Sequence, residues 1–491
     1  MSTKRGAHTV AIPHQGSEAI IGRKSTEYCG VLGFKSHSSI VSSLYFGLRS
    51  LQHRGQESAG ISLYNNNKVY TYKGMGLVHE VFTRNLLDSL SGNSGIGHVR
   101  YSTAGSSIIS NAQPIMIHTA MGDMAIAHNG EISNAADVRE YLERAGDSFF
   151  TESDTELILK LIALESTKRG NIIDGIKKSM RYLKGSYSLA FQINDRIFAI
   201  RDPLGIRPLV LGKLDGGYGI ASESVVFDAL GGKTIRDIYP GEILEIEPDE
   251  AITHYRIENV QTAFCMFEYV YFARADSTMN SKNIYSVRKN LGKFLAREHP
   301  ADADIVVPVP DSGRTHALGY AEEANIPFAE GLMKNRYIDR TFIMPSEKER
   351  VQEIQLKLNP IKEVINGKKI VLIDDSIVRG NTTKKIVKLL KNAGAEKVHV
   401  RIASPPIIAP CYLGIDMKTR SQFIASGKTV EEIREIINAD SLGYLSIAGL
   451  VKAIGINEND LCLGCLTGTY PVPIKGEKYR DQLILNNFYK L

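Results

Sequence analysis

The chain has 491 residues, which is too many for one typical hydrophobic core, so two or three domains are expected. Hydrophobic residues make up 43% and charged residues 23% of the sequence, as in ordinary water-soluble globular proteins, and no apolar run is long enough to span a bilayer. The net charge of +5 is small for this length, which gives no reason to expect a nucleic-acid partner but suits an anionic substrate.

Residues 1–28 form a polar, partly basic tail. They contain turn formers and only short apolar pieces, such as residues 19–21. Because the tail lacks a continuous apolar segment, a secretory signal is not expected. We therefore expect a cytoplasmic protein without a membrane partner.

Cys29 opens the first predicted strand, Cys29–Phe34. Three dense polar clusters follow, each after or within an apolar pattern, as binding loops on a scaffold do. The clusters are Gln52–Glu57, His98–Thr103 and Ala127–Glu131. Each cluster alone is a weak signal, because Arg-Gly and Asn-Gly pairs are common in surface turns. In combination with the cysteine they predict a catalytic site.

Cys29 and these clusters resemble the N-terminal-nucleophile glutaminase domain of the glutamine phosphoribosylpyrophosphate (PRPP) amidotransferases. The resemblance implies an α+β fold with αββα layers over residues 29–260, and a propeptide, residues 1–28, whose removal makes Cys29 the first residue. It also implies that Cys29 attacks the glutamine amide, while the Asn129 side chain and the Gly130 N–H form the oxyanion hole. The residues implied to bind glutamine are Arg54, Arg100 and Asp154.

The chemistry of a thiol explains why cleavage before Cys29 matters. A free thiol has a pKa of about 8.5, and the thiolate is the nucleophile. A free α-amine, with a pKa of about 8, can act as the local base once the preceding peptide bond is broken. Family propeptides often end in Glu, whereas this one ends in Glu27-Tyr28 and is longer than many. The efficiency of its cleavage is therefore open.

From about residue 261, predicted strands alternate with helical stretches. This alternation predicts a parallel sheet with crossover helices. The predicted strands lie within residues 306–313, 368–373 and 397–403. Ligands of such sheets bind outside the carboxyl ends of the strands, where Asp311-Ser312 and Asp374-Asp375 lie.

Ile370–Thr383 is the most informative segment of the chain. An apolar run ends in Asp374 and Asp375, and a short loop leads into an amphipathic segment that begins at Lys384. Backbone N–H groups and the helix dipole favour a phosphate at such a helix start. Paired carboxylates suit vicinal ribose hydroxyls or Mg²⁺. An ordinary turn with an acidic cap is the alternative, and the Gly-Asn-Thr-Thr loop argues against it.

This segment resembles the PRPP signature of type I phosphoribosyltransferases, which have an α/β fold with a parallel sheet. By that resemblance, Asp374 and Asp375 hold the ribose hydroxyls and Mg²⁺, and Ser312 joins the Mg²⁺–pyrophosphate site. The residues implied to cradle the 5′-phosphate are Arg379, Gly380, Asn381, Thr382 and Thr383. The flexible loop that closes over PRPP is implied to contribute Lys334, Arg336, Tyr337 and Lys357.

Removing Cys29 leaves four of the five cysteines, and without an export signal structural disulfides are not expected. Cys462 and Cys465 have Cys-x-x-Cys spacing, which alone is compatible with zinc, a redox pair or chance. With Cys265 and Cys411 they match the 4Fe–4S ligands of one amidotransferase subfamily whose members also carry a propeptide. Sulfur ligation suits zinc as well as a cluster. The resemblance favours the cluster, in a structural and oxygen-sensitive role.

The resemblance predicts a complete domain order: a propeptide (1–28), a glutaminase domain (29–260), a phosphoribosyltransferase domain (261–445) and a C-terminal extension (446–491) that carries the Cys462/Cys465 pair. The predicted enzyme converts PRPP, glutamine and water into 5-phosphoribosylamine, glutamate and pyrophosphate, the first step of de novo purine synthesis. Purine nucleotides as inhibitors and a homotetramer are further implications.

Two alternatives remain at this point. A glucosamine-phosphate synthase shares the glutaminase half but needs a sugar-isomerase half, and the loop after Asp374 and Asp375 argues against that. A PRPP-sensing regulator is a binding protein that keeps the phosphate loop without turnover. It has no use for Cys29, Arg100 and Asn129 together.

Overall fold

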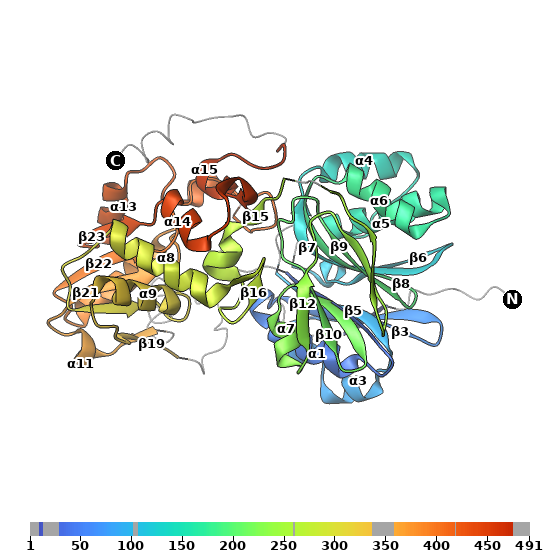
Figure 1. The fold of residues 1–491 in the computed structure, drawn as a ribbon, viewed down its shortest axis with the longest axis horizontal. Helices are drawn as coiled ribbons and strands as arrows, with labels where there is room; N and C mark the ends of the chain where they lie inside the picture. Colours follow the sequence, from blue (N-terminus) through green and yellow to red (C-terminus); the bar gives the residue numbers. More distant parts are fainter. Residues whose placement is uncertain are drawn as a thin grey trace.

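The chain folds into two lobes that follow each other in sequence. The computed structural model describes residues 9–12, 29–101, 107–258, 261–335, 358–417 and 419–474. In Figure 1 the blue-to-green residues form one lobe and the yellow-to-red residues form the other. The change of pattern near residue 261 therefore coincides with a change of lobe, while the individual domain boundaries stay predictions.

The first lobe contains two sheets. The larger sheet orders its strands as β1 (Thr9–Ile12), β4 (Lys68–Met75), β3 (Ser58–Asn65), β5 (Ser94–Arg100), β2 (Gly30–Ser36), β11 (Gly217–Ala221), β10 (Val210–Leu214) and β12 (Lys233–Asp237). The smaller sheet orders its strands as β14 (Ala251–Tyr255), β13 (Ile243–Ile246), β9 (Arg196–Arg201), β8 (Gly185–Ile193), β7 (Gly122–Ile132) and β6 (Ile115–Thr119). Strand β2 is buried along its whole length, as the apolar run after Cys29 predicts.

Helices cover the outer face of each sheet. The helices on the larger sheet include α1 (Val41–Ser50) and α7 (Val225–Ala229), and those on the smaller sheet are α4 (Ala135–Arg144), α5 (Asp154–Arg169) and α6 (Ile172–Tyr182). Side chains from β2 and β5 of one sheet and from β7, β8 and β9 of the other form a shared core between the sheets. The layers therefore run helix, sheet, sheet, helix, which confirms the predicted αββα fold.

Strand β1 is an element that the sequence did not predict. It lies within the proposed propeptide and pairs in parallel with β4, with Thr9 opposite Thr71 and Ile12 opposite Gly74. The polar tail therefore adds an edge strand to the larger sheet.

The second lobe is built on a parallel sheet. Its strands are ordered β18 (Ile305–Pro308), β21 (Lys369–Asp374), β22 (Lys397–Ile402) and β23 (Ser441–Tyr444). The first three confirm the strands predicted from the sequence. The short strand β23 was missed, because Ser441–Tyr444 contains glycine and lacks a sustained apolar run.

Alternate residues of β21 face opposite layers of helices. Val371 and Ile373 pack with the core that contains α8 (Ile284–Glu298), α9 (Arg314–Ala324) and α14 (Ile447–Ile454). Ile370 and Leu372 pack with the core that contains α12 (Asn381–Asn392) and α13 (Val430–Ile437). Because both faces are covered, the strand is apolar at successive positions. The predicted α/β fold is confirmed.

Helix α14 lies within the predicted C-terminal extension, yet it contributes Leu450 to the same core as α8. Along the part of the chain that the structure describes, no helix is long and apolar enough to cross a membrane.

Helices α8 and α9 touch through their backbones. A Cβ atom added at Gly292 would lie 1.9 Å from the His316 carbonyl oxygen, and one at Gly319 would lie 1.9 Å from the Lys289 carbonyl oxygen. This approach allows the two helices to pack closely beneath the sheet.

We predict that Gly292→Ala destabilises the second lobe by about 1–3 kcal/mol, because the added methyl group forces two backbones apart. The midpoint of thermal unfolding measured by calorimetry should fall. Lys293→Ala on the same helix, at a partly exposed side chain, should change stability by less than about 0.5 kcal/mol. Equal midpoints for both variants would contradict the close-packing interpretation.

Candidate active sites

Cys29 lies immediately before β2 with its side chain buried. Its thiol donates to the Tyr101 carbonyl at a sulfur–oxygen distance of 3.7 Å. Burial raises the pKa of the thiol to about 11, against the lowering effects of the Tyr101 carbonyl contact and of Arg100. Glu57 and Asp154 also act on this pKa, so these charges surround the sulfur. In the chain that still carries its first 28 residues, the thiol is therefore protonated at neutral pH.

Arg100 ends β5, next to β2 in the sheet. It was predicted to bind the glutamine carboxylate. In the structure its Nη1 donates to Glu57 Oε1 at 2.5 Å, and both side chains are buried. The sequence placed Glu57 in a polar cluster without giving it a role, and the structure shows that it orients Arg100.

Asn129 and Gly130 lie on β7 of the other sheet. The side-chain nitrogen of Asn129 is buried and has no hydrogen-bond partner within the described ranges, so it is available as a donor. Gly130 has φ +149°, and an added Cβ atom would lie 2.1 Å from the Ser186 carbonyl oxygen. Only glycine therefore fits at this position.

Asp154 connects this strand with Cys29. It is the first residue of α5, whose cap is the Ser153 hydroxyl. Its Oδ2 accepts from the Ile132 N–H at 3.1 Å, and its Oδ1 lies 3.6 Å from His128 Nδ1. The structure therefore brings together the predicted nucleophile, the β7 residues and this carboxylate.

Arg54 is completely buried beside Cys29. Its Nε donates to the Cys29 carbonyl at 3.2 Å, its Nη1 to Glu223 at 2.5 Å and its Nη2 to Glu268 at 2.6 Å. The first of these contacts holds the backbone of Cys29. A direct contact of Arg54 with glutamine stays a prediction.

The second site lies at the carboxyl end of the parallel sheet. Asp374 ends β21 and is buried, as is Asp375. Asp374 accepts from the N–H of Asp375, which in turn accepts from the Ser376 hydroxyl at 2.5 Å. The loop that follows ends at Gly380, with φ +76°, and α12 begins at the next residue. The predicted order of strand, acidic pair, loop and helix is confirmed.

The predicted phosphate residues differ in exposure. Arg379 and Asn381 are exposed, Thr382 is half-buried, and Gly380 and Thr383 are buried. All of them lie at or just before the amino-terminal end of α12, where a phosphate is favoured.

Ser312 and Lys334 lie near the same edge of the sheet. The N–H of Val309 donates to the Ile373 carbonyl at 2.8 Å, which brings the turn containing Ser312 beside Asp374. Lys334 Nζ forms an ion pair with Asp311 at 3.0 Å in that turn. The other predicted loop residues, Arg336, Tyr337 and Lys357, lie outside the described residues.

The four remaining cysteines come from three distant segments that meet where the two lobes adjoin. The short parallel strands β15 (Phe264–Cys265) and β24 (Leu461–Cys462) align their cysteines in register. The carbonyl of Cys465 accepts from the backbone of the loop that leads to Cys411. All four are free thiols.

The four thiols also influence one another. Burial raises the pKa of each of them, that of Cys411 to about 12. Neighbouring thiols raise the pKa of Cys411, Cys462 and Cys465 further. Within the described residues, no group of three or more His, Cys, Asp or Glu side chains is arranged to hold a metal ion.

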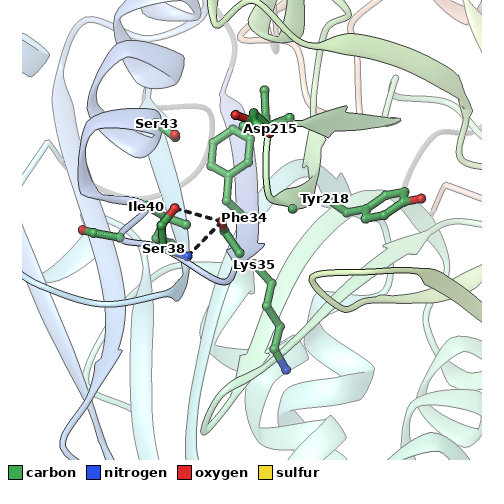
Figure 2. Close-up of a pocket in the computed structure, with 11 residues that line it drawn as sticks. Phe34, Lys35, Ser38, Ile40, Ser43, Asp215 and Tyr218 are labelled. Carbon is green, nitrogen blue, oxygen red and sulfur yellow. Dashed lines mark hydrogen bonds between the residues drawn. The ribbon is translucent and has the colours of Figure 1, made fainter.

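A small cavity elsewhere in the first lobe is not a substrate site (Figure 2). It has a volume of about 40 Å³ and lies between the end of β2, the start of α1 and the β10–β11 turn. That volume accepts only one or two water molecules.

Comparisons with known proteins follow the same division into two halves. A family model described as "Glutamine amidotransferase domain" matches residues 98–229, and one described as "Phosphoribosyl transferase domain" matches residues 280–404. The amidophosphoribosyltransferase of Methanothermobacter thermautotrophicus is 49% identical over 452 residues, which cover 91% of this chain and 95% of the relative. The enzyme of the same name from Bacillus subtilis is 44% identical over 464 residues, which cover 93% of this chain and 96% of the relative.

The chain belongs to the amidophosphoribosyltransferase family. A solved structure of the Bacillus subtilis glutamine PRPP amidotransferase, complexed with ADP and GMP, superposes with a TM-score of 0.85 at 43% identity, covering 92% of this chain and 99% of that one. Another, described as the allosteric regulatory enzyme of purine biosynthesis, gives a TM-score of 0.86 at 43% identity, covering 93% and 98%.

Membership of this family makes the chain a glutamine-dependent PRPP amidotransferase of purine synthesis. The sugar-isomerase alternative is wrong, because the second half matches a phosphoribosyltransferase domain. The alternative of a PRPP-sensing regulator is also wrong, because the relatives are enzymes.

Sequence reasoning did not identify the two carboxylates that pair with Arg54 beside Cys29. Glu223 and Glu268 are both buried and bind Arg54. They lie 169 and 214 residues away from it in the chain, and neither belongs to a recognisable motif.

We predict that in chains that retain residues 1–28 the alkylation of Cys29 accelerates about tenfold per pH unit between pH 7 and pH 10, since only the thiolate reacts. The sign follows from burial: a raised pKa keeps the thiol neutral until the pH approaches about 11. Iodoacetamide labelling followed by peptide mass mapping separates Cys29 from the other cysteines. A rate that is flat with pH would contradict the assigned burial.

Proposed function

We propose that glutamine is hydrolysed at Cys29 after the peptide bond between Tyr28 and Cys29 has been cleaved, so that residues 1–28 are a propeptide. The buried thiol supports this proposal, because its pKa of about 11 leaves little thiolate in the uncleaved chain. Cleavage places an α-amine with a pKa of about 8 on the same Cα atom, within reach of the thiol proton.

The glutamine amide is attacked by Cys29, and the negative charge that develops on the amide oxygen is stabilised by Asn129 and Gly130. The observation that carries this assignment is the buried Asn129 nitrogen, which lacks a partner within the described part of the chain. A preorganised donor of this kind stabilises the transition state without reorganisation. Arg100 receives the glutamine α-carboxylate and Asp154 the α-amine, while Arg54 completes the site behind Cys29.

The second site transfers ammonia to the anomeric carbon of PRPP. Asp374 and Asp375 hold the ribose hydroxyls, and with Ser312 they would hold Mg²⁺. The fit of the donor set is good, because buried carboxylate oxygens and a serine side chain are the hard oxygen ligands that Mg²⁺ prefers. When bound, Mg²⁺ neutralises charge on the departing pyrophosphate.

No protein nucleophile is needed in the transferase half, so its residues act by positioning. The backbone from Arg379 to Thr383 binds the 5′-phosphate at the start of α12. Lys334 meets the pyrophosphate with Arg336, Tyr337 and Lys357 as the loop closes, and closure excludes water. Ammonia passes internally from one site to the other, because ammonium in neutral water is a poor nucleophile.

Cys265, Cys411, Cys462 and Cys465 would hold a 4Fe–4S cluster. Thiolates are the ligands that such a cluster takes, and the pairing of β15 with β24, which places Cys265 opposite Cys462, supports this proposal. When bound, such a cluster would link segments that are far apart in sequence, so its role would be structural and it would be sensitive to oxygen. With both a propeptide and a cluster, the chain would belong to the iron–sulfur branch of the family.

Purine nucleotides inhibit the enzyme, which acts as a homotetramer in the cytoplasm. The solved Bacillus subtilis relative complexed with ADP and GMP supports nucleotide binding. The proposed domains are 29–260 for the glutaminase, 261–445 for the transferase and 446–491 for the extension.

We predict that exchanging one residue in each site separates the two reactions. Cys29→Ala should lower glutamine-dependent pyrophosphate release by at least about 10³-fold and leave ammonium-dependent release unchanged, because the nucleophile serves only glutamine. Asp374→Asn should lower both by about 10²-fold or more. Both rates are measured with PRPP and Mg²⁺ on anaerobically purified protein.

Asp304→Asn is the matched control, since this carboxylate accepts from the Lys369 N–H at the opposite end of β21. It should retain both rates. A Cys29→Ala protein that still used glutamine would exclude Cys29 as the nucleophile, and a fully active Asp374→Asn protein would exclude the acidic pair.

We also predict about four iron atoms per chain in anaerobically purified protein, with the visible absorbance of a cluster. Cys462→Ser should lose both signals, whereas Cys29→Ser should keep them. Elemental analysis and absorbance spectroscopy provide the measurement. Zinc in place of iron would overturn the cluster assignment.

A further inference from the structure

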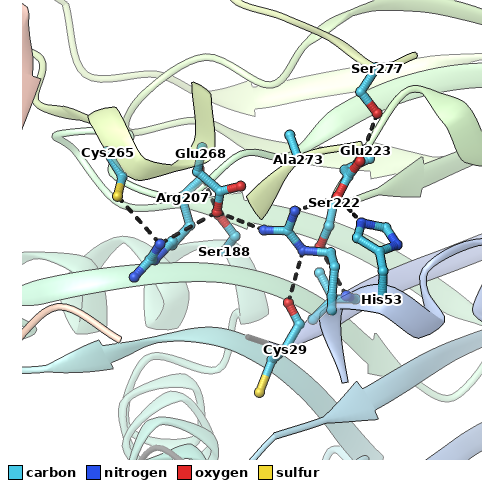
Figure 3. Close-up of polar contacts among 12 residues, drawn as sticks. Cys29, His53, Ser188, Arg207, Ser222, Glu223, Cys265, Glu268, Ala273 and Ser277 are labelled. Carbon is cyan, nitrogen blue, oxygen red and sulfur yellow. Dashed lines mark hydrogen bonds and ion pairs between the residues drawn. The ribbon is translucent and has the colours of Figure 1, made fainter. Parts of the chain in front are cut away.

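A chain of buried charges links Cys29 to the transferase half (Figure 3). Arg54 donates to the Cys29 carbonyl and to Glu268 Oε1, and Arg207 Nη1 lies 3.4 Å from the same Glu268 oxygen. The two guanidinium groups are completely shielded from water, and the carboxylate is 2% exposed. Both arginines belong to the glutaminase half.

Glu268 belongs to the other half of the chain. It opens a short π-helix, Glu268–Phe272, that lies between β15 and α8. Arg288 of α8 donates to the carbonyls of Tyr269 and Ala273, at 3.0 and 2.6 Å. The short π-helix is therefore anchored to α8, so the Glu268 carboxylate has a fixed position relative to the transferase core.

The same network reaches the oxyanion side of the glutaminase site. Arg207 donates from Nε and Nη2 to the Leu413 carbonyl, at 3.2 and 2.9 Å. The next residue, Gly414, has φ +102°, and a Cβ atom there would lie 3.0 Å from the backbone of Gly130. A transferase-half loop thus lies directly against the strand that carries the oxyanion donor.

Only one of the two carboxylate oxygens of Glu268 accepts hydrogen bonds from described residues. Its Oε1 accepts from both arginines, whereas its Oε2 is buried and has no partner among the described residues. A buried carboxylate oxygen without a hydrogen bond lowers the stability of the fold. If this ion pair served stability alone, both oxygens of Glu268 should accept hydrogen bonds. The arrangement instead aims one oxygen at the two arginines.

We infer that Glu268 is a positioning residue for glutamine hydrolysis, which holds Arg54 against the Cys29 carbonyl so that the nucleophile is oriented only when the transferase half is docked. Fixing this carbonyl fixes the Cα atom of Cys29, which carries both the thiol and the α-amine freed by cleavage. The inference rests on the proposed role of Cys29 as nucleophile.

The test compares Glu268→Asp with the wild-type chain. Aspartate keeps the charge that compensates the two arginines but withdraws the carboxylate by one methylene group, so the 2.6 Å contact with Arg54 is lost. The measurements are kcat and KM for glutamine hydrolysis and the rate of ammonium-dependent pyrophosphate release. Mass spectrometry of the N-terminus restricts the comparison to chains that begin at Cys29.

Glu268→Asp should lower kcat for glutamine hydrolysis by about 10–100-fold, since small displacements of a nucleophile are costly. KM for glutamine should stay within about threefold, and the ammonium-dependent rate should be unchanged. Combining it with Arg54→Lys should be no worse than the slower single variant, because both changes break the same contact.

Glu245→Gln is the control for a lost buried ion pair. Glu245 pairs with Arg196 and His254 in the smaller sheet, and none of these contacts leads to Cys29. It should leave kcat for glutamine hydrolysis unchanged.

An unchanged kcat in Glu268→Asp, an equal loss of the ammonium-dependent rate, or an equal loss in Glu245→Gln would each overturn the inference. Additive losses in the double variant would do so as well. Failure of the underlying proposal is distinguishable, because it would appear as glutamine hydrolysis by Cys29→Ala.

Discussion

The buried guanidinium of Arg54 is the interaction on which the arrangement of the two halves depends. A charge removed from water costs several kcal/mol unless it is compensated. Compensation comes from Glu223 of its own half and Glu268 of the other, at 2.5 and 2.6 Å. Glu223 in turn accepts from the Arg274 N–H and the Ser277 hydroxyl across the junction. Neither half satisfies these groups alone, so the charges hold the lobes in one relative position.

The two sites use the fold in different ways. In the glutaminase half, the candidate residues Cys29 and Asn129 lie beside β2 and on β7, strands of adjoining sheets that are far apart in sequence. In the transferase half, one strand ends in Asp374 and the next helix begins a few residues later, so the site is nearly continuous in sequence.

The cysteine site lies at the same junction as the ion pairs. Arg207 Nη1 lies 3.5 Å from the Cys265 sulfur while the same guanidinium binds Glu268 and the Leu413 carbonyl. The segment after Cys411 therefore contacts both the charge network and Gly130.

The sequence by itself determined the elements whose signals are local. The apolar run, acidic pair and small-residue loop before α12 specify a strand, a turn and a helix start from neighbouring residues alone. Cys29 and the polar clusters indicated where the candidate site of the first half lies. Resemblance to a known family added residue roles that spacing could not give.

Only the tertiary structure decided how these elements meet. The partners of Arg100 and Arg54 are carboxylates 43, 169 and 214 residues distant, and their pairing depends on which strands adjoin and how the lobes dock. Strands β1 and β23 were not predicted for a related reason. Short strands are stabilised by their neighbours in the sheet rather than by a hydrophobic pattern of their own. Propensity acts over a few residues, whereas burial and charge compensation act across the folded chain.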